Sequence, residues 1–295
     1  MITAKKLTYA AIPSDAGQVQ GWKDIPINDS HRDLLIPIGP LSPEAGILTT
    51  SAIYFGEHSN SPYAATIHTL EGSLLTLFAR RSVVRRLVTA EKLLPVGYHL
   101  IVFDAYRPYQ VQKSLYDFYK QKLGEKYPDM DNRTLEAETQ NYVSLPSTDP
   151  TRPSPHNSGG AVDVAIISHG RMLDFGTAFD HGGEKAALAY YESRIAAGET
   201  LTDKDMRACN NRRLLFAVMT QAGFQPYFAE WWHFNAPESQ MGAASAGIDH
   251  ASFGAADLDE NNMAHEYRRL KIHRETGGPK LAGDWPTEII APPES

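Results

Sequence analysis

The chain of 295 residues contains a single cysteine, Cys209. One cysteine cannot form an internal disulfide, and it excludes a cysteine-rich zinc finger. No run of about 18 apolar residues occurs, so we expect no transmembrane helix. The N-terminal segment Met1–Lys6 leads into polar residues and lacks the apolar stretch of a signal peptide, which favours a cytoplasmic protein.

An excess of positive charge is also missing. The chain has 28 Lys and Arg against 35 Asp and Glu, a net charge of −7, which argues against nucleic acid as the main partner. Its one basic cluster, Arg80, Arg81, Arg85 and Arg86, favours a solvated helix face over a phosphate site. With 42% hydrophobic residues the chain is neither fibrous nor wholly disordered, and its length allows one large domain or two small ones.

Hydrophobic patterns predict a mixture of helices and strands. Helices are expected at residues 79–94, from Pro108 to Gly124, at 182–200 and at 211–221. Strands are expected at 34–38, 98–103, 161–167 and 227–234. These elements do not alternate strictly as βαβ units, which favours an α+β fold over a doubly wound sheet.

A histidine and an aspartate are separated by six residues, rich in glycine and small side chains, in the segment Ser154–Asp163. Such a loop can fold back and bring His156 and Asp163 together, and imidazole nitrogen and carboxylate oxygen are both good zinc ligands. A glycine turn that enters a strand, with Asp163 as a cap, explains this segment equally well.

A carboxylate and a third imidazole flank two tryptophans in the segment Glu230–His233. Residues i and i+3 of a regular strand point to opposite faces, so the backbone must turn or bulge if both serve one site. An aromatic core strand is the alternative, although buried titratable groups then need partners. A catalytic zinc site combines three protein ligands with a nearby base, for which His156, Asp163 and His233 would be the ligands and Glu230 the base.

An arginine follows the expected strand in the segment Phe103–Pro108. At such a strand-to-helix junction Arg107 could face a cleft and stabilise the oxyanion that forms when water attacks a carbonyl. Pairing with Asp104, or capping of a neighbouring element, is the simpler interpretation of this segment by itself.

In this order the three segments resemble the D-alanyl-D-alanine dipeptidases, zinc enzymes linked to vancomycin resistance, and more broadly the related D,D-carboxypeptidases. The family patterns D-x-Y-R-P, S-x-H-x-x-x-x-x-x-D and E-W-W-H stand here at residues 104–108, 154–163 and 230–233. Supporting similarity runs from about residue 45 to residue 236. The resemblance implies an α+β fold with a central antiparallel sheet, flanking helices and a single zinc site in a cleft.

The resemblance also implies a role for each motif residue. One zinc ion per chain would be bound by His156, Asp163 and His233. Glu230 would be the general base, and Arg107 would stabilise the transition state.

Three further residues are implied as substrate-binding. The segment Gly176–Asp180 is similar to the family's G-[ST]-x-F-D pattern, whose aspartate holds the substrate ammonium. Asp180 would therefore bind the amine, Tyr54 would share that task, and Ser154 would hold the other end of the dipeptide.

These assignments predict a hydrolase of peptidoglycan metabolism, a zinc metallopeptidase that cleaves D-alanyl-D-alanine. A D,D-carboxypeptidase acting on longer peptidoglycan peptides is the first alternative, and a non-catalytic zinc-binding recognition module is the second. The oligomeric state is left open.

One site spanning the motifs also predicts the domain organisation. The interval 104–233 cannot be divided without splitting the zinc site. We therefore expect one catalytic domain at 45–236, an N-terminal arm at 1–44 packed on it, and a C-terminal extension at 237–295.

Overall fold

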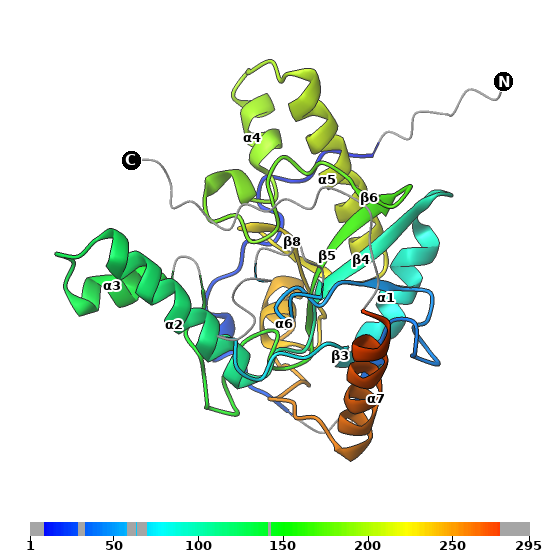
Figure 1. The fold of residues 1–295 in the computed structure, drawn as a ribbon. Coiled ribbons are helices and arrows are strands. Elements are labelled where there is room, and N and C mark those ends of the chain that lie inside the picture. The colour runs from blue at the N-terminus through cyan, green and yellow to red at the C-terminus, as the bar shows by residue number, and fades with distance from the viewer. Residues whose placement is uncertain (1–8, 29–32, 58–62, 64–69, 141–142, 278–295) are drawn as a thin grey trace.

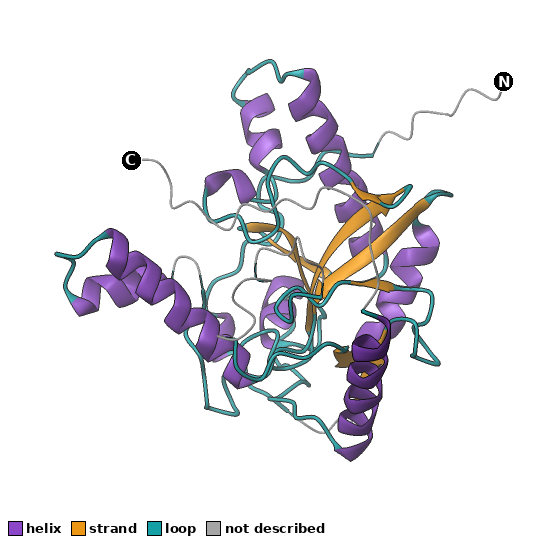
Figure 2. Cartoon of the chain, in the orientation of Figure 1, coloured by secondary structure: helices purple, strands orange, loops and turns teal. Residues whose placement is uncertain are grey.

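A mixed sheet runs through the middle of the fold, and helices surround it (Figures 1 and 2). The computed structural model describes residues 9–28, 33–57, 63, 70–140 and 143–277. The sheet has the strand order β2 (Thr49–Thr50), β4 (Tyr98–Asp104), β5 (Ala161–Ser168), β8 (Glu230–Asn235) and β7 (Gln225–Tyr227), with β6 (Arg171–Met172) beside β5. Every pairing is antiparallel except that of β2 with β4, which is parallel. The expected α+β class is therefore confirmed, and the expected antiparallel sheet holds for all but one pairing.

A second, smaller sheet and the helices complete the described part of the chain. The small sheet pairs β1 (Leu35–Ile38) with β3 (Leu77–Arg80). The helices are η1 (Trp22–Asp24), α1 (Arg81–Leu93), α2 (Tyr109–Lys126), α3 (Asn132–Thr139), η3 (Glu184–Ala186), α4 (Tyr190–Ala196), α5 (Asp203–Gln221), α6 (Gln240–Ala246) and α7 (Glu260–Thr276). Helix α1 packs against α5, and α2 packs against α3. The pair α2 and α3 projects away from the sheet (Figure 1). Within the described residues no helix is both long enough and apolar enough to cross a membrane.

Local sequence patterns explain the elements that carry the core. The apolar residues of α1 lie on one face, where Val83, Val84 and Leu87 are fully buried. Strands β4 and β5 are apolar along most of their length, and most of their residues are buried. These two long neighbouring strands form the rigid support on which the polar side chains described below are mounted.

Several element boundaries differ from the sequence prediction. The helix expected at 211–221 begins at residue 203, because the Thr202 hydroxyl accepts the Asp205 amide as an N-cap. The single helix expected at 182–200 is instead the short pair η3 and α4, preceded by Gly183 in a backbone conformation with φ of 140° that breaks a helix. Helix α2 continues past Gly124 and ends at residue 126.

The described parts of the predicted N-terminal arm and C-terminal extension lie against the rest of the fold. The Ile12 amide donates to Glu192, Ile27 pairs with Ala251 in an isolated bridge, and α7 contacts β1. The boundaries of the arm, catalytic domain and extension themselves stay predictions.

Candidate active site

Three neighbouring strands present polar side chains at one level of the central sheet. Asp163 of β5 pairs in register with His233 of β8 on one side and with Asp104 of β4 on the other. All three side chains are buried. Asp163 is thus a strand residue, and the alternative in which it caps a turn is wrong.

The loop that carries His156 folds back as its glycines predict. The Ser158 amide donates to the Ser154 carbonyl and the Gly159 amide to the His156 carbonyl. Gly159 has a φ of 69°, and a Cβ there would lie 2.7 Å from Leu35 Cδ2, so a larger residue would be strained and would displace the Leu35 side chain. The tight loop returns His156 to the start of β5, beside Asp163.

The irregularity expected in the aromatic segment is present. Pro226 pairs with Phe234, but the next residue, Tyr227, pairs with Glu230, so the register jumps between them. The single strand expected at 227–234 is therefore the end of β7 together with most of β8, which form a hairpin. Residues 231–233 of β8 have no pairing partner on β7. This break in pairing lets Glu230 and His233 approach, and 3.7 Å separates Glu230 Oε2 from His233 Nδ1.

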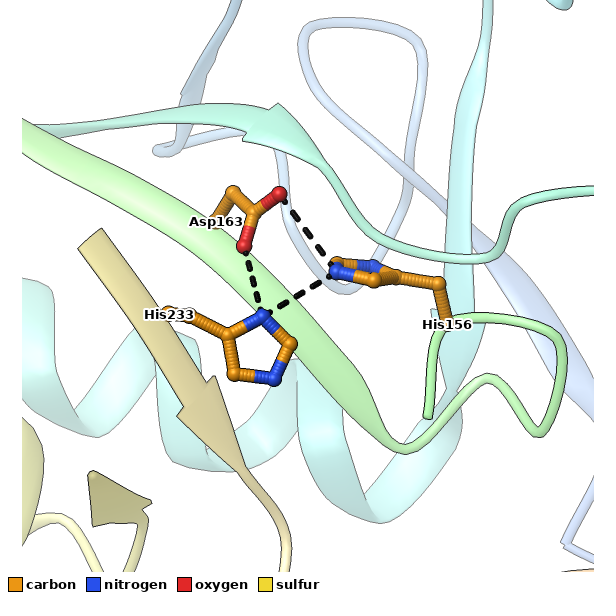
Figure 3. A group of neighbouring side chains, drawn as sticks. All are labelled: His156, Asp163 and His233. Carbon is orange, nitrogen blue, oxygen red and sulfur yellow. Dashed lines mark hydrogen bonds and ion pairs between the residues drawn. The ribbon is translucent and has the colours of Figure 1, made fainter. Parts of the chain in front are cut away.

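His156, Asp163 and His233 form a compact group, called here the metal trio (Figure 3). His156 Nε2 lies 3.2 Å from His233 Nδ1, and the two carboxylate oxygens of Asp163 lie 3.0 Å from His233 Nδ1 and 3.4 Å from His156 Nε2. A tetrahedral zinc site with bonds of about 2.0–2.1 Å places neighbouring ligand atoms about 3.3 Å apart. The spacing in the trio matches that of three ligands of one zinc ion.

The outer hydrogen bonds of both imidazoles also fit a metal ion. His156 Nδ1 lies 2.8 Å from the Ala105 carbonyl, which only accepts, so this nitrogen carries the proton and Nε2 presents a lone pair. His233 Nε2 lies 3.2 Å from Asn235 Oδ1 and likewise donates, which leaves a lone pair on Nδ1. In these tautomers the inner nitrogens of both rings and the Asp163 carboxylate are available to one metal ion, and the outer hydrogen bonds fix the orientation of the rings.

Arg107 is held beside the trio by a dense set of acceptors. Its Nε lies 2.8 Å and its Nη2 2.7 Å from Asp104 Oδ2, and its Nη1 donates to Gln112 Oε1 over 2.8 Å. Its Nη2 lies 3.7 Å from Asp163 Oδ2. Burial alone would lower the pKa of Arg107, but Asp104, Tyr54 and Asp163 raise it, so the guanidinium stays charged. The pairing with Asp104 and a position at the cavity, which the sequence left as alternatives, occur together.

Two tyrosines donate to the carboxylate of Asp180. Tyr63 donates to Oδ2 over 2.8 Å and Tyr54 donates to the same oxygen over 3.1 Å. The Asp180 backbone has a φ of 58°, a left-handed conformation that is uncommon for a residue other than glycine. Desolvation first, and then the negative charge of Asp163, raises the pKa of Asp180 to about 6.

One cavity of about 470 Å³ is lined by the metal trio, Arg107 and Asp180. Its lining includes all eight site residues predicted from the sequence: Tyr54, Arg107, Ser154, His156, Asp163, Asp180, Glu230 and His233. The Ser154 hydroxyl accepts the Asn157 amide over 3.3 Å at the cavity wall. Desolvation raises the pKa of Glu230 to about 7, with Asp163 and Asp180 adding to the rise and His233 and Arg107 opposing it.

Some residues of this site were missed by the sequence analysis. Tyr63 and Tyr119 line the cavity and lie 3.0 Å apart at their hydroxyls, but neither belongs to a motif that would have marked it. Gln112 stands five residues after Arg107, a spacing that the expected helix at Pro108 could have suggested. Asn235, two residues after His233, alternates onto the same face of β8 and could have been inferred as its support.

Two imidazoles and a carboxylate converging beside a glutamate and an arginine form the side-chain set of a mononuclear metallopeptidase. The comparisons with known proteins agree with this class. The family model described as "D-ala-D-ala dipeptidase" matches residues 45–252, more than two thirds of the chain. The chain belongs to this family.

Curated relatives carry the same description. The D-alanyl-D-alanine dipeptidase of Escherichia coli is 33% identical over 144 residues, which is 48% of this chain and 58% of that protein. The dipeptidase of Synechocystis sp. is 27% identical over 148 residues, 47% of this chain and 60% of that protein. The match therefore spans about three fifths of the length of these relatives.

Among solved structures, VanYB in complex with D-Alanine-D-Alanine is similar at 17% identity, with a TM-score of 0.34. The similarity covers 61% of this chain and 82% of that one. At this TM-score the likeness carries no weight for fold or function.

Proposed function

We propose that the chain is a zinc-dependent dipeptidase that hydrolyses D-alanyl-D-alanine. One observation carries the proposal: the metal trio, the carboxylates of Glu230 and Asp180, and the guanidinium of Arg107 all line a single cavity. The family of the chain and the names of its curated relatives point to the same substrate.

His156, Asp163 and His233 would hold the zinc ion, since their donor atoms and spacing fit it. Zinc, when bound, would polarise the substrate carbonyl and lower the pKa of a water molecule to about 7. The hydrogen bonds from His156 to the Ala105 carbonyl and from His233 to Asn235 orient both rings for this task.

Glu230 is the general base of the proposed reaction. Its carboxylate takes a proton from the attacking water as the water oxygen bonds to the carbonyl carbon. It then gives this proton to the amide nitrogen as the C–N bond breaks, which releases two D-alanines. Its Oε2 atom, 3.7 Å from His233 Nδ1, lies beside the metal trio, where the scissile bond must sit.

Arg107 and Asp180 bind the two charged parts of the reacting substrate. The Arg107 guanidinium, fixed by Asp104 and Gln112, donates to the developing oxyanion. The Asp180 carboxylate accepts the substrate ammonium, while Tyr54 bridges Asp180 and Arg107. Because Asp180 binds a free amine at a fixed distance from the scissile bond, the site selects dipeptides over longer peptides.

The test is Glu230→Ala in the full chain. We expect the variant to keep about one zinc per chain while turnover of D-alanyl-D-alanine falls by about 10²–10⁴-fold, because the ligands remain and only the base is lost. Metal analysis and a D-alanine release assay measure the two effects. Full turnover in a zinc-loaded variant would refute the role of Glu230.

A substrate panel tests the activity itself. Wild-type protein, with and without a chelator, is assayed on D,D-, L,D- and L,L-dipeptides and on a muramyl-type pentapeptide. Chelator-sensitive cleavage of the D,D-dipeptide above the others supports the proposal. Cleavage of the pentapeptide alone would replace it with a D,D-carboxypeptidase, and zinc binding without any cleavage would leave a recognition module.

A further inference from the structure

Helix α7 docks on the rest of the fold through one polar face. Four of its contacts come from Asn262, Glu266, Arg269 and His273, which recur at helical spacing. Beside this face, the His265 ring meets the Phe78 ring at 6.2 Å. Asn262 donates to the β1 backbone over 3.1 Å, and Glu266 accepts the amides of residues 75 and 76, each over 2.8 Å. The last two residues of this face, Arg269 and His273, both reach the turn at residues 52–57.

That turn is closed by its own backbone and by one buried carboxylate. The Gly56 amide donates to the Ile53 carbonyl, and Gly56 takes a φ of 69°, a conformation that suits glycine. The Glu57 amide donates to the Ala52 carbonyl over 3.3 Å, and Glu57 Oε2 accepts the Ala52 amide over 2.9 Å. The Glu57 side chain therefore ties together the first and last residues of the turn.

Arg269 neutralises this carboxylate from α7. Arg269 Nη2 lies 2.6 Å from Glu57 Oε1, and the Glu57 side chain is fully buried. A buried carboxylate that loses its counter-charge is strongly destabilised. One helical turn further on, the His273 ring meets the Phe55 ring edge to face at 5.9 Å. Two contacts on the same face of α7 thus hold the same turn.

Tyr54 lies at the middle of this turn and reaches the cavity. Its hydroxyl accepts from Arg107 Nη2 over 3.0 Å and donates to Asp180 over 3.1 Å, and its ring lies 4.7 Å from the Arg107 guanidinium carbon. The position of the turn therefore decides where this bridging hydroxyl lies.

We propose that α7 positions Tyr54 for substrate binding through the ion pair of Arg269 with Glu57, so that a helix outside the matched family region sets the affinity for the substrate amine. Arg269 and Glu57 are positioning residues, and neither lines the cavity. This inference rests on the proposed function, because it assigns the Asp180 corner to the substrate ammonium.

The neighbouring contacts predict an effect on KM rather than on kcat. If Tyr54 moves, Arg107 keeps Asp104 and Gln112, so its place at the reacting carbonyl is preserved. Asp180 loses the Tyr54 donor and keeps Tyr63, so the amine-binding carboxylate is less well oriented.

The experiment compares Arg269→Gln with Arg268→Gln, a matched change at the exposed neighbouring residue of the same helix. In the zinc-loaded full chain we expect Arg269→Gln to raise KM for D-alanyl-D-alanine about tenfold, the worth of one hydrogen bond to a charged group, with kcat within about threefold. Arg268→Gln should change neither constant. Arg269→Lys keeps the positive charge, so its KM should lie between that of Arg269→Gln and that of wild type.

Hydrogen exchange gives a readout that does not need activity. The Ala52 and Glu57 amides should exchange faster in Arg269→Gln than in wild type or Arg268→Gln, because both are protected by the turn that Arg269 holds. If wild-type protein does not cleave the dipeptide, the proposed function fails, and exchange still decides whether α7 holds this turn.

Two results would overturn the inference: unchanged KM and exchange in a folded Arg269→Gln protein, or an equal rise of KM in both variants. If Arg269→Gln does not fold, Glu57→Gln takes its place, because Arg269 can then turn toward solvent. A raised KM in Glu57→Gln supports the inference, and an unchanged KM overturns it.

Discussion

Replacing Asp180 by asparagine should stabilise the metal-free protein at neutral pH while it weakens substrate binding. The change is nearly isosteric, and an Oδ1 acceptor remains for Tyr54 and Tyr63. Asparagine also tolerates the left-handed backbone of this residue, where φ is 58°. The substitution therefore removes the charge and little else.

The pKa of Asp180 sets the magnitude. Desolvation and the charge of Asp163 raise this pKa from 3.8 to about 6. Each pKa unit is worth about 1.36 kcal/mol, so ionised Asp180 costs the folded state about 3 kcal/mol at pH 7. Because the folded-state pKa is the higher one, the penalty is absent below the unfolded value, grows as the pH rises through 4 to 6, and is constant above that.

Urea denaturation of chelator-treated wild type and Asp180→Asn at several pH values measures this penalty. We expect the variant to gain in free energy of unfolding relative to wild type as the pH rises from about 4.5 to 6.5, reaching about 3 kcal/mol, with no further gain to pH 8. With zinc and D-alanyl-D-alanine, KM should rise at least about tenfold, because a charged partner of the ammonium is lost. A stability difference that does not change with pH would refute the reasoning.

Three further predictions concern other residues. Arg107→Lys keeps the charge but loses the planar fork that reaches several acceptors, so kcat for the dipeptide should fall about 10²-fold with zinc content unchanged. Gly17→Ala should lower the melting temperature and kcat/KM together, because a Cβ would lie 2.8 Å from the Phe228 amide at the cavity rim. Gly21→Ala is its control, since its φ is also positive but its Cβ would meet nothing closer than 3.9 Å, and equal effects of the two would contradict the explanation. Burial, and then Glu192, raises the pKa of the Cys209 thiol to about 11, so iodoacetamide at pH 8 should label it only in urea, as mass spectrometry would show.

The sequence by itself determined much of the core and eight of the residues that line the cavity. Strands β4 and β5 and helix α1 were predictable because their signals are local: apolar periodicity followed by proline or glycine. The glycine-rich loop between His156 and Asp163 predicted that these two side chains meet. Glu230 and His233, on either side of the two tryptophans, were predicted to share that site, since buried titratable groups need partners. All eight predicted site residues line one cavity, and their roles stay proposals.

Only the tertiary structure decided how these residues are supported. Tyr63 donates to Asp180 and contacts the Tyr119 hydroxyl, all from segments far apart in the chain, and no local pattern marks the two tyrosines. The register jump between β7 and β8 occurs in a strand, β8, that also pairs with β5, so it involves three strands at once. The ion pair of Arg269 with Glu57 joins residues 212 positions apart. Local sequence patterns report backbone preference and which face is apolar, whereas such contacts arise only when the whole chain has packed.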